Sequence, residues 1–316
     1  MQSEAKKMNQ VIIYGAKETG KRYLDFLEWR GLKDRVLGFC DKNYQEIQTV
    51  GGLSVFSYEA AKQINVPFLI AVSEKSAVAE VLHMFKEDGL EGYLFTDLYR
   101  LLEEEQSVFL REWCAYHHAK NNDVWYKEAE KKESVKVFWE DSTPFYQYFK
   151  ELDLRNVIEL ACGRGRHVPY YLNLAGQITL VDILEENIEF CKERFKEEKN
   201  IIYYRNNGYN FEELLSNCYT SVFSYDSMVH FELLDIYEYL KDIYRVLQKG
   251  GKALLHHSNY DADYKADFAH APHARCFMNK NIFAYLAVRA GFRVLDQKII
   301  DWYDKSNLDC ISLLEK

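Results

Sequence analysis

The residues best suited to chemistry lie where an apolar run near the middle of the chain gives way to a loop of small residues. Residues 156–172 read NVIELACGRGRHVPYYL, in which Glu159, Ala161, Gly163 and Gly165 alternate with other residues. A loop between a strand and a helix N-terminus presents backbone N–H groups, and its glycines let a ligand approach the backbone closely. The segment therefore predicts a cofactor cradle.

Positive side chains flank the same loop. Arg164, Arg166 and His167 lie near the start of the helix predicted from residue 166, where a cation opposes the helix macrodipole. This placement points to an anionic ligand group nearby, with an ordinary tight turn bearing exposed arginines as the alternative.

Polar residues also follow the next three apolar runs. Asp182 ends the second run, where a carboxylate commonly binds the hydroxyl pair of a ribose. The pair Asn207 and Gly208 follows the third run, and Asp226 follows the fourth. Ordered along the chain, these residues are a stronger signal than the glycine loop by itself.

This ordered set, with VLQKGG before a fifth run and a closing strand pair, resembles the class I S-adenosylmethionine-dependent methyltransferases over roughly residues 105–316. The resemblance implies an α/β fold with a Rossmann-like sheet of seven strands, the last antiparallel, and S-adenosylmethionine as cofactor. This sequence departs from the family pattern at Ala161, which replaces a glycine, and at Asn207, which replaces an acid near the adenine. The cofactor-binding residues that it implies are Glu159, Ala161, Gly163, Gly165, Asp182, Ile183, Asn207, Gly208 and Asp226.

Histidines gather where the resemblance places the methyl acceptor. Methyl transfer is an in-line displacement, so much of the catalysis is holding the acceptor in line. A hydroxyl acceptor also benefits from a base whose pKa lies near ambient pH, and histidine is the usual choice. His230, after the fourth run, and His257, after the fifth, are the candidate catalytic bases. The alternative for His230 is a histidine packed under the helix that follows.

The acceptor itself is expected to be a sugar-like small molecule. His256, Asn259 and His273 suit hydroxyl groups, and Arg275 suits a phosphate or carboxylate unless it pairs with a nearby acid. The segments HHSN, HAPHAR (which contains His270) and the C-terminal strand pair resemble methyltransferases of bacterial surface-polysaccharide clusters. That resemblance implies O-methylation of a sugar or nucleotide-linked sugar. No metal is expected, because no acidic ligand pattern accompanies the histidines.

Two further segments precede this region. Residues 1–100 alternate strands and helices, which predicts a parallel sheet, and resemble the small Rossmann-like units of sugar acyltransferases. Lys17 stands where a dinucleotide site needs glycine. We therefore expect this domain to serve in assembly or in holding the acceptor, with a nucleotide site as the alternative. Residues 101–150 are aromatic and mostly helical, including Trp125, and predict core packing, a cap over the ligand site, or both. Residues 151–316 form the expected methyltransferase domain.

Composition narrows the remaining classes. The chain has 316 residues, 48% of them hydrophobic, and a net charge of −9. Without a basic stripe we expect no nucleic acid partner, and without a long apolar run we expect no membrane partner. Seven cysteines without a C-x-x-C pair, and no apolar signal region, predict a cytoplasmic protein. A homo-oligomer, an NAD(P)-dependent oxidoreductase using the N-terminal domain, and a non-catalytic nucleotide-sensing scaffold stay open.

Overall fold

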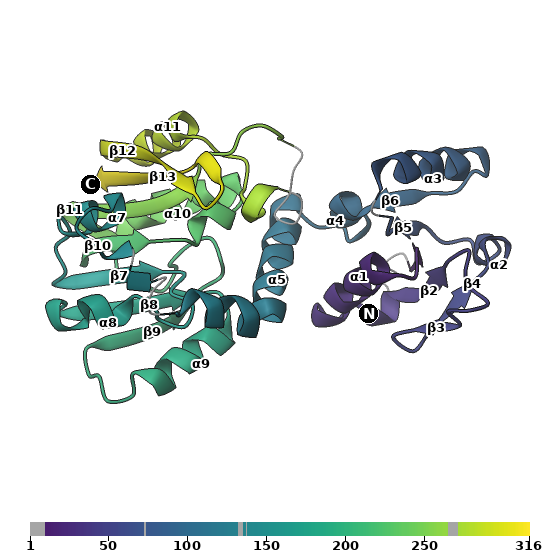
Figure 1. Ribbon diagram of the computed structural model, residues 1–316, viewed down its shortest axis with the longest axis horizontal. Coiled ribbons are helices and arrows are strands. Elements are labelled where there is room, and N and C mark those ends of the chain that lie inside the picture. The colour runs from purple at the N-terminus through teal and green to yellow at the C-terminus, as the bar shows by residue number, and fades with distance from the viewer. Residues whose placement is uncertain (1–9, 73, 132–134, 137, 265–270) are drawn as a thin grey trace, which may run out of the picture. The chain divides into compact units, whose positions relative to one another are not determined.

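The computed structural model describes residues 10–72, 74–131, 135–136, 138–264 and 271–316 (Figure 1). The chain divides into two compact units, Met1–Phe109 and Leu110–Lys316. Each unit is built on its own sheet, and each is described by itself below.

The larger unit is built on a seven-stranded sheet in the order β12-β13-β11-β10-β7-β8-β9 (Figure 1). β13 is antiparallel to β11 and to β12, whereas the other neighbouring pairs run parallel. The predicted sheet of seven strands with the last antiparallel is confirmed. The strands are β7 (Asn156–Leu160), β8 (Gln177–Asp182), β9 (Ile201–Arg205), β10 (Tyr219–Ser224), β11 (Leu247–Ser258), β12 (Arg293–Trp302) and β13 (Lys305–Glu315).

Helices cover both faces of this sheet, which is why its central strands are almost continuously apolar. The apolar side chains of α10 and α11 pack in one core cluster, and those of α7, α8 and α9 pack in the other. α5 (Gln106–Ala129) runs along the edge at which the parallel strands end (Figure 1). The other helices are α7 (Pro144–Phe149), α8 (Val168–Tyr171), α9 (Glu185–Arg194), α10 (Leu233–Val246) and α11 (Lys280–Ala290).

Helix ends follow the sequence at α11 but not at α8. The Asn279 side chain accepts a hydrogen bond from the Ile282 N–H, and Gly291 has a φ of 110°, so both predicted caps of α11 are confirmed. The helix predicted from residue 166 starts instead at Val168 and lasts one turn. Pro169 lies in that turn, where a missing N–H costs least.

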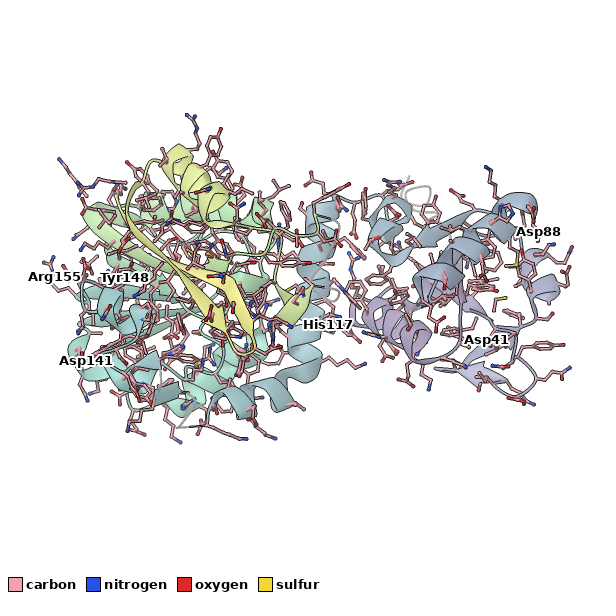
Figure 2. All side chains as sticks on the ribbon, turned by 45° about the horizontal axis from the view of Figure 1, so that its top comes forward. Asp41, Asp88, His117, Asp141, Tyr148 and Arg155 are labelled. Carbon is pink, nitrogen blue, oxygen red and sulfur yellow. The ribbon has the colours of Figure 1, made fainter. Side chains whose placement is uncertain are left out.

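The smaller unit has a six-stranded sheet in the order β3-β4-β2-β1-β5-β6. Sequence reasoning missed the hairpin of β3 and β4, whose signal is the two-glycine turn of Gly51 and Gly52. The Asp41 side chain, labelled in Figure 2, lies just after β2. Its carboxylate accepts a hydrogen bond from the Ala16 N–H at 2.8 Å, which ties the loop after β1 to the end of β2. The elements are β1 (Val11–Tyr14), α1 (Glu18–Trp29), β2 (Val36–Cys40), β3 (Thr49–Val50), β4 (Leu53–Phe56), α2 (Tyr58–Lys62), β5 (Phe68–Ile70), α3 (Lys75–Glu87), β6 (Gly92–Leu94) and α4 (Leu98–Leu101).

Over the part of the chain that the structure describes, every helix is too short or too polar to cross a membrane.

Candidate active site

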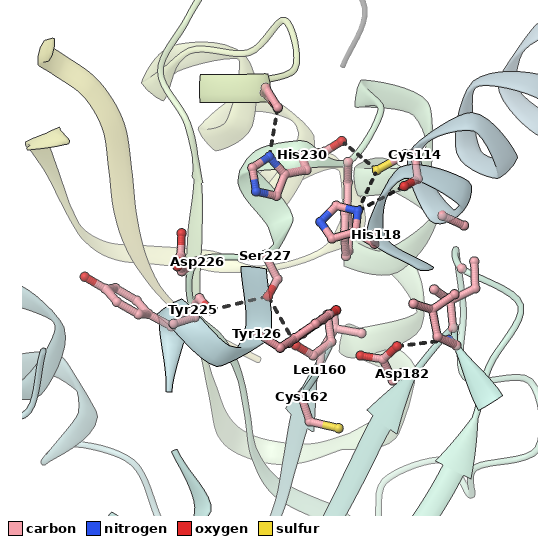
Figure 3. Close-up of a pocket in the computed structure, with 18 of the residues that line it drawn as sticks. Cys114, His118, Tyr126, Leu160, Cys162, Asp182, Tyr225, Asp226, Ser227 and His230 are labelled. Carbon is pink, nitrogen blue, oxygen red and sulfur yellow. Dashed lines mark hydrogen bonds between the residues drawn. The ribbon is translucent and has the colours of Figure 1, made fainter. Parts of the chain in front are cut away.

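A cavity of about 490 Å³ lies at the carboxyl ends of β7, β8, β9 and β10 (Figure 3). Its size falls within the range of small-molecule and cofactor sites. α5 forms one wall and the glycine loop another, and residues 273–275 also line the cavity. The sequence predicted a ligand at this edge of the sheet, and the cavity is there.

The glycine loop takes a shape that its residue types allow. Gly163 has a φ of 55°, and a Cβ built there would lie 2.6 Å from the Tyr126 ring. Ala161, which replaces a family glycine, has a φ of 56° and lines the cavity. Gly165 has a φ of 72°, and its missing side chain makes room for Phe195 behind the loop. The loop therefore needs glycine at 163 and 165 but tolerates alanine at 161.

Asp182 holds the loop in place from the end of β8. Its carboxylate accepts hydrogen bonds from the N–H groups of Gly163 and Leu184, both at 2.9 Å, and from the Asn187 side chain at 3.1 Å. It is 5% exposed and lines the cavity beside Ile183, and burial raises its pKa. Asp182 thus shapes the loop and also faces the cavity.

Asn206, rather than Asn207, faces the main cavity beside Gly208. The Asn207 side chain closes a turn by accepting from the backbone N–H groups of residues 209 and 210. The Asn206 amide donates to the Tyr239 hydroxyl at 2.7 Å, and its buried Oδ1 has no partner among the described residues. Sequence reasoning missed Asn206 because a one-residue change in the turn decides which asparagine points inward.

One face of α5 lines the cavity from end to end. Arg111, Cys114, His118 and Tyr126 lie on this face at roughly helical spacing. At one end Arg111 forms two hydrogen bonds with the carboxylate of Asp235 on α10, at 2.5 and 3.0 Å. α5 thus lies over the cavity, as a cap would, while Trp113 and Tyr116 of the same helix are buried.

His230 lines the cavity with a fixed ring orientation. Its Nδ1 lies 2.8 Å from the Ala274 carbonyl, which can only accept, so Nδ1 carries the proton and Nε2 the lone pair. Burial, with smaller contributions from His118 and Arg275, lowers the pKa of His230 to about 3. This contradicts the expectation of a base with a pKa near ambient pH.

His118 on α5 is a cavity residue that sequence reasoning missed. Its ring centroid lies 5.4 Å from that of His230 (Figure 3). Its Nδ1 lies 3.0 Å from the Cys114 carbonyl one turn earlier, which again places the lone pair on Nε2. Burial lowers the pKa of His118, so both histidines are neutral acceptors at pH 7. The sequence showed only a histidine within a segment predicted to be helical.

His257 does not line the cavity, and we withdraw it as a candidate base. It is fully buried, its ring stacks 3.7 Å from that of Phe283 on α11, and its Nε2 lies 2.8 Å from the Ser312 hydroxyl. Burial lowers its pKa to about 3. Side chains alternate along β11, and that of His257 points to the α11 face of the sheet.

His256 and Asn259 are likewise held by the protein rather than turned to the cavity. His256 is fully buried between the Asp226 N–H and the Asp309 carboxylate. The Asn259 side chain donates to the Asn307 carbonyl and accepts from the Lys280 N–H. Neither residue lines the cavity, which contradicts their predicted contacts with the substrate.

His273 and Arg275 do line the cavity, but each has an acidic partner. The Arg275 guanidinium is 2% exposed and donates to both oxygens of Asp309, at 2.9 and 2.6 Å. His273 Nε2 lies 3.0 Å from the Asp304 carboxylate. The alternative given for Arg275, pairing with an acid, is the arrangement present.

Glu159 lies behind the glycine loop and does not line the cavity. Its carboxyl is 2% exposed and accepts a hydrogen bond from the Tyr171 hydroxyl at 2.6 Å. Burial raises its pKa to about 7. Arg166, by contrast, turns into the cavity and pairs with Asp226 at 2.8 Å, so this loop arginine is not solvent-exposed as the alternative supposed.

Within the described residues, no three histidine, cysteine or acidic side chains are placed to hold a metal ion. His270 and the side chain of Trp125 lie outside those residues.

Comparison with known families adds one match. Residues 158–255 match the family model described as "Methyltransferase domain". The match begins within β7 and ends within β11, so it contains the glycine loop, Asp182 and Asp226. A comparison with curated protein sequences finds no match.

Solved structures share part of the chain's fold at low identity. An S-adenosylmethionine-dependent methyltransferase from Mesorhizobium loti is 12% identical, with a TM-score of 0.45, and covers 56% of this chain and 99% of its own. One from Aquifex aeolicus is 14% identical, with a TM-score of 0.45, and covers 60% and 95%. A protein from Pyrococcus horikoshii is 19% identical, with a TM-score of 0.42, and covers 58% and 99%. Likeness at this level carries no information about substrates.

The family match and the sheet agree. Residues 158–255 run from β7 into β11 and so contain strand ends that line the cavity. The sheet has the seven strands, with the last antiparallel, that the sequence resemblance implies. The chain therefore carries a methyltransferase domain over residues 158–255, with S-adenosylmethionine as its cofactor.

Proposed function

We propose that this enzyme methylates a hydroxyl group of a sugar or nucleotide-linked sugar, in surface-polysaccharide biosynthesis. The observation that carries the proposal is the pair of neutral imidazoles, His118 and His230, in one wall of the cavity. In each ring a carbonyl fixes the proton on Nδ1 and so makes Nε2 a hydrogen-bond acceptor. Acceptor nitrogens suit a substrate that donates through hydroxyl groups.

The cavity fits S-adenosylmethionine at its other end. Asp182 presents a carboxylate that suits the ribose hydroxyls, and the unpartnered Oδ1 of Asn206 suits an amino group such as that of adenine. Ala161 and Cys162 of the glycine loop line the cavity and suit the methionine portion, while Gly163 lets the Tyr126 ring pack against the loop. The cofactor supplies an electrophilic methyl carbon on a sulfonium.

Under this proposal His230 accepts the hydroxyl hydrogen bond and later the proton. With a pKa of about 3 it cannot deprotonate a free hydroxyl to any extent at pH 7. The hydroxyl becomes strongly acidic as its oxygen gains the methyl group, and then even a weak base takes the proton at Nε2. His230 therefore holds the acceptor in line first and removes the proton late.

The charges and the lining on the acceptor side of the cavity also favour a substrate with an uncharged ring. Arg166 is paired with Asp226, and Arg275 with Asp309, so the ionic groups there already have partners. Trp302 lines the same side and adds an apolar edge to it, with Arg275 and Phe138 packed on its ring.

The test is a methylation screen of the purified enzyme with nucleotide sugars, free sugars, small phenols and amines, with S-adenosylhomocysteine release as the readout. The proposal predicts turnover with a sugar hydroxyl. It also predicts that His230→Ala lowers turnover by about 10²-fold with little change in cofactor affinity. Turnover confined to phenols or amines would exclude the sugar proposal.

A further inference from the structure

Asp226 holds an unusual backbone conformation at the cavity wall. It follows β10 and has a φ of 57°, in the left-handed region that residues other than glycine seldom adopt. Its backbone N–H donates to His256 Nδ1 at 3.0 Å, and its carboxylate accepts from Arg166 at 2.8 Å. The conformation is thus held at the backbone by β11 and at the side chain by the glycine loop.

His256 is fixed in one tautomer by its two partners. Because its Nδ1 accepts from a backbone N–H, the proton must lie on Nε2, which donates to Asp309 at 3.1 Å. The ring is fully buried and stacks on Tyr225, with centroids 4.6 Å apart. An imidazole with one fixed tautomer and a stacked face is a rigid spacer between β10 and β13.

Asp309 on β13 is anchored in turn by Arg275. It is fully buried and accepts two hydrogen bonds from the guanidinium, at 2.9 and 2.6 Å. Burial raises the pKa of Asp309, but the hydrogen bonds from His256 and Arg275 outweigh it and hold that pKa at about 2. The Arg275 guanidinium lies over the Trp302 ring, 5.0 Å from its centroid.

Together Arg275, Asp309, His256 and Asp226 form a polar chain that ends on Arg166 of the glycine loop. Buried charges of this kind add little to stability compared with well-packed apolar side chains. Hydrogen bonds between fixed partners do, however, hold these four side chains in one arrangement.

We propose that His256 is a positioning residue for the cofactor: it holds the left-handed turn of Asp226, so that the Asp226 carboxylate keeps Arg166 and the glycine loop in the conformation that binds S-adenosylmethionine. The polar chain thereby couples the acceptor side of the cavity, at Arg275, to the cofactor side, at Arg166. This role concerns the cofactor and does not depend on which acceptor is methylated.

The test compares three variants of the full chain by titration with S-adenosylhomocysteine. His256→Leu leaves the Asp226 N–H without an acceptor and should weaken binding about tenfold. His256→Gln can accept through its oxygen and donate through its nitrogen, so it should restore most of the affinity. His257→Leu is the matched control, because His257 is equally buried on the same strand but contacts Ser312 and Phe283 instead.

Three results would overturn the proposal: unchanged affinity in His256→Leu, an equal loss in His256→Gln, or an equal loss in His257→Leu. Thermal unfolding checks that each variant is folded. Should His256→Leu not fold, ¹⁵N NMR of the histidines in the wild-type protein decides, since the polar chain requires the Nε2–H tautomer at His256. A charged ring or an Nδ1–H tautomer would refute it.

Discussion

Glu159→Gln should make the protein more stable at pH 8 without stabilising it at pH 4.5. The Glu159 carboxyl is 2% exposed, and its pKa lies at about 7 instead of 4.5. Below pH 4.5 the group is neutral in both the folded and the unfolded chain. Between pH 4.5 and 7 the unfolded chain ionises this carboxyl in water while the folded chain keeps it protonated, so stability falls over that interval and levels off above pH 7. At 1.36 kcal/mol for each pKa unit, about 3 kcal/mol of stability is lost by pH 8.

Glutamine has the same shape and can still accept the hydrogen bond of the Tyr171 hydroxyl, but it does not ionise. Urea unfolding of wild type and Glu159→Gln at pH 4.5 and pH 8 gives the two differences in unfolding free energy. We expect near-equality at pH 4.5 and a gain of about 3 kcal/mol for the variant at pH 8. Glu186→Gln, a change at an exposed site of α9, is the control. A variant that is less stable than wild type by the same amount at both pH values would refute the reasoning.

Four further predictions follow from the cavity. Gly163→Ala should weaken S-adenosylhomocysteine binding about tenfold or more, because of its φ of 55° and the approach of 2.6 Å to Tyr126; titration should show a smaller loss when Tyr126 is also changed to leucine. Asn206→Ala should lower the same affinity about tenfold, and equal affinity would remove Asn206 from the cofactor site. The pKa of His230 is about 3, so its protonation should not lower turnover between pH 7 and pH 5. A fall in the pH–rate profile near pH 6.5 that is absent in His230→Gln would contradict this. A chain starting at residue 104, which keeps all of α5, should still bind S-adenosylhomocysteine, whereas a folded fragment that does not bind it would show that the first unit shares the site.

The sequence was informative where residue type and local conformation coincide. The glycines at 163 and 165 predict a loop, and both have positive φ values. Asn279 and Gly291 bracket α11 as expected. Alternating strands and helices predict parallel pairing because a crossover connection leaves few other arrangements. The strands joined through helices pair in parallel in both sheets, whereas the hairpins β3–β4 and β12–β13 are antiparallel.

The sequence was least informative where the direction of a side chain decides its role. Of the three histidines predicted at the acceptor side of β10 and β11, only His230 lines the cavity, while His256 and His257 are buried on opposite faces of β11. Strand periodicity predicts that neighbours diverge, but not that both find partners inside the protein. Asn206 and His118 were missed because the direction of their side chains also decides their role. The turn after β9 points Asn206 into the cavity, and the orientation of α5 about its axis does the same for His118.

The central claim is that S-adenosylmethionine binds in the cavity at the carboxyl edge of the seven-stranded sheet, with Asp182 in contact with it. Isothermal titration with S-adenosylhomocysteine tests it most directly, using wild type, Asp182→Asn and the control Asp153→Asn, which alters a carboxylate that pairs with exposed Arg155. We predict single-site binding by wild type and by Asp153→Asn, and binding at least about tenfold weaker by Asp182→Asn. Absence of binding by wild type, or equal affinity in a folded Asp182→Asn variant, would contradict the claim.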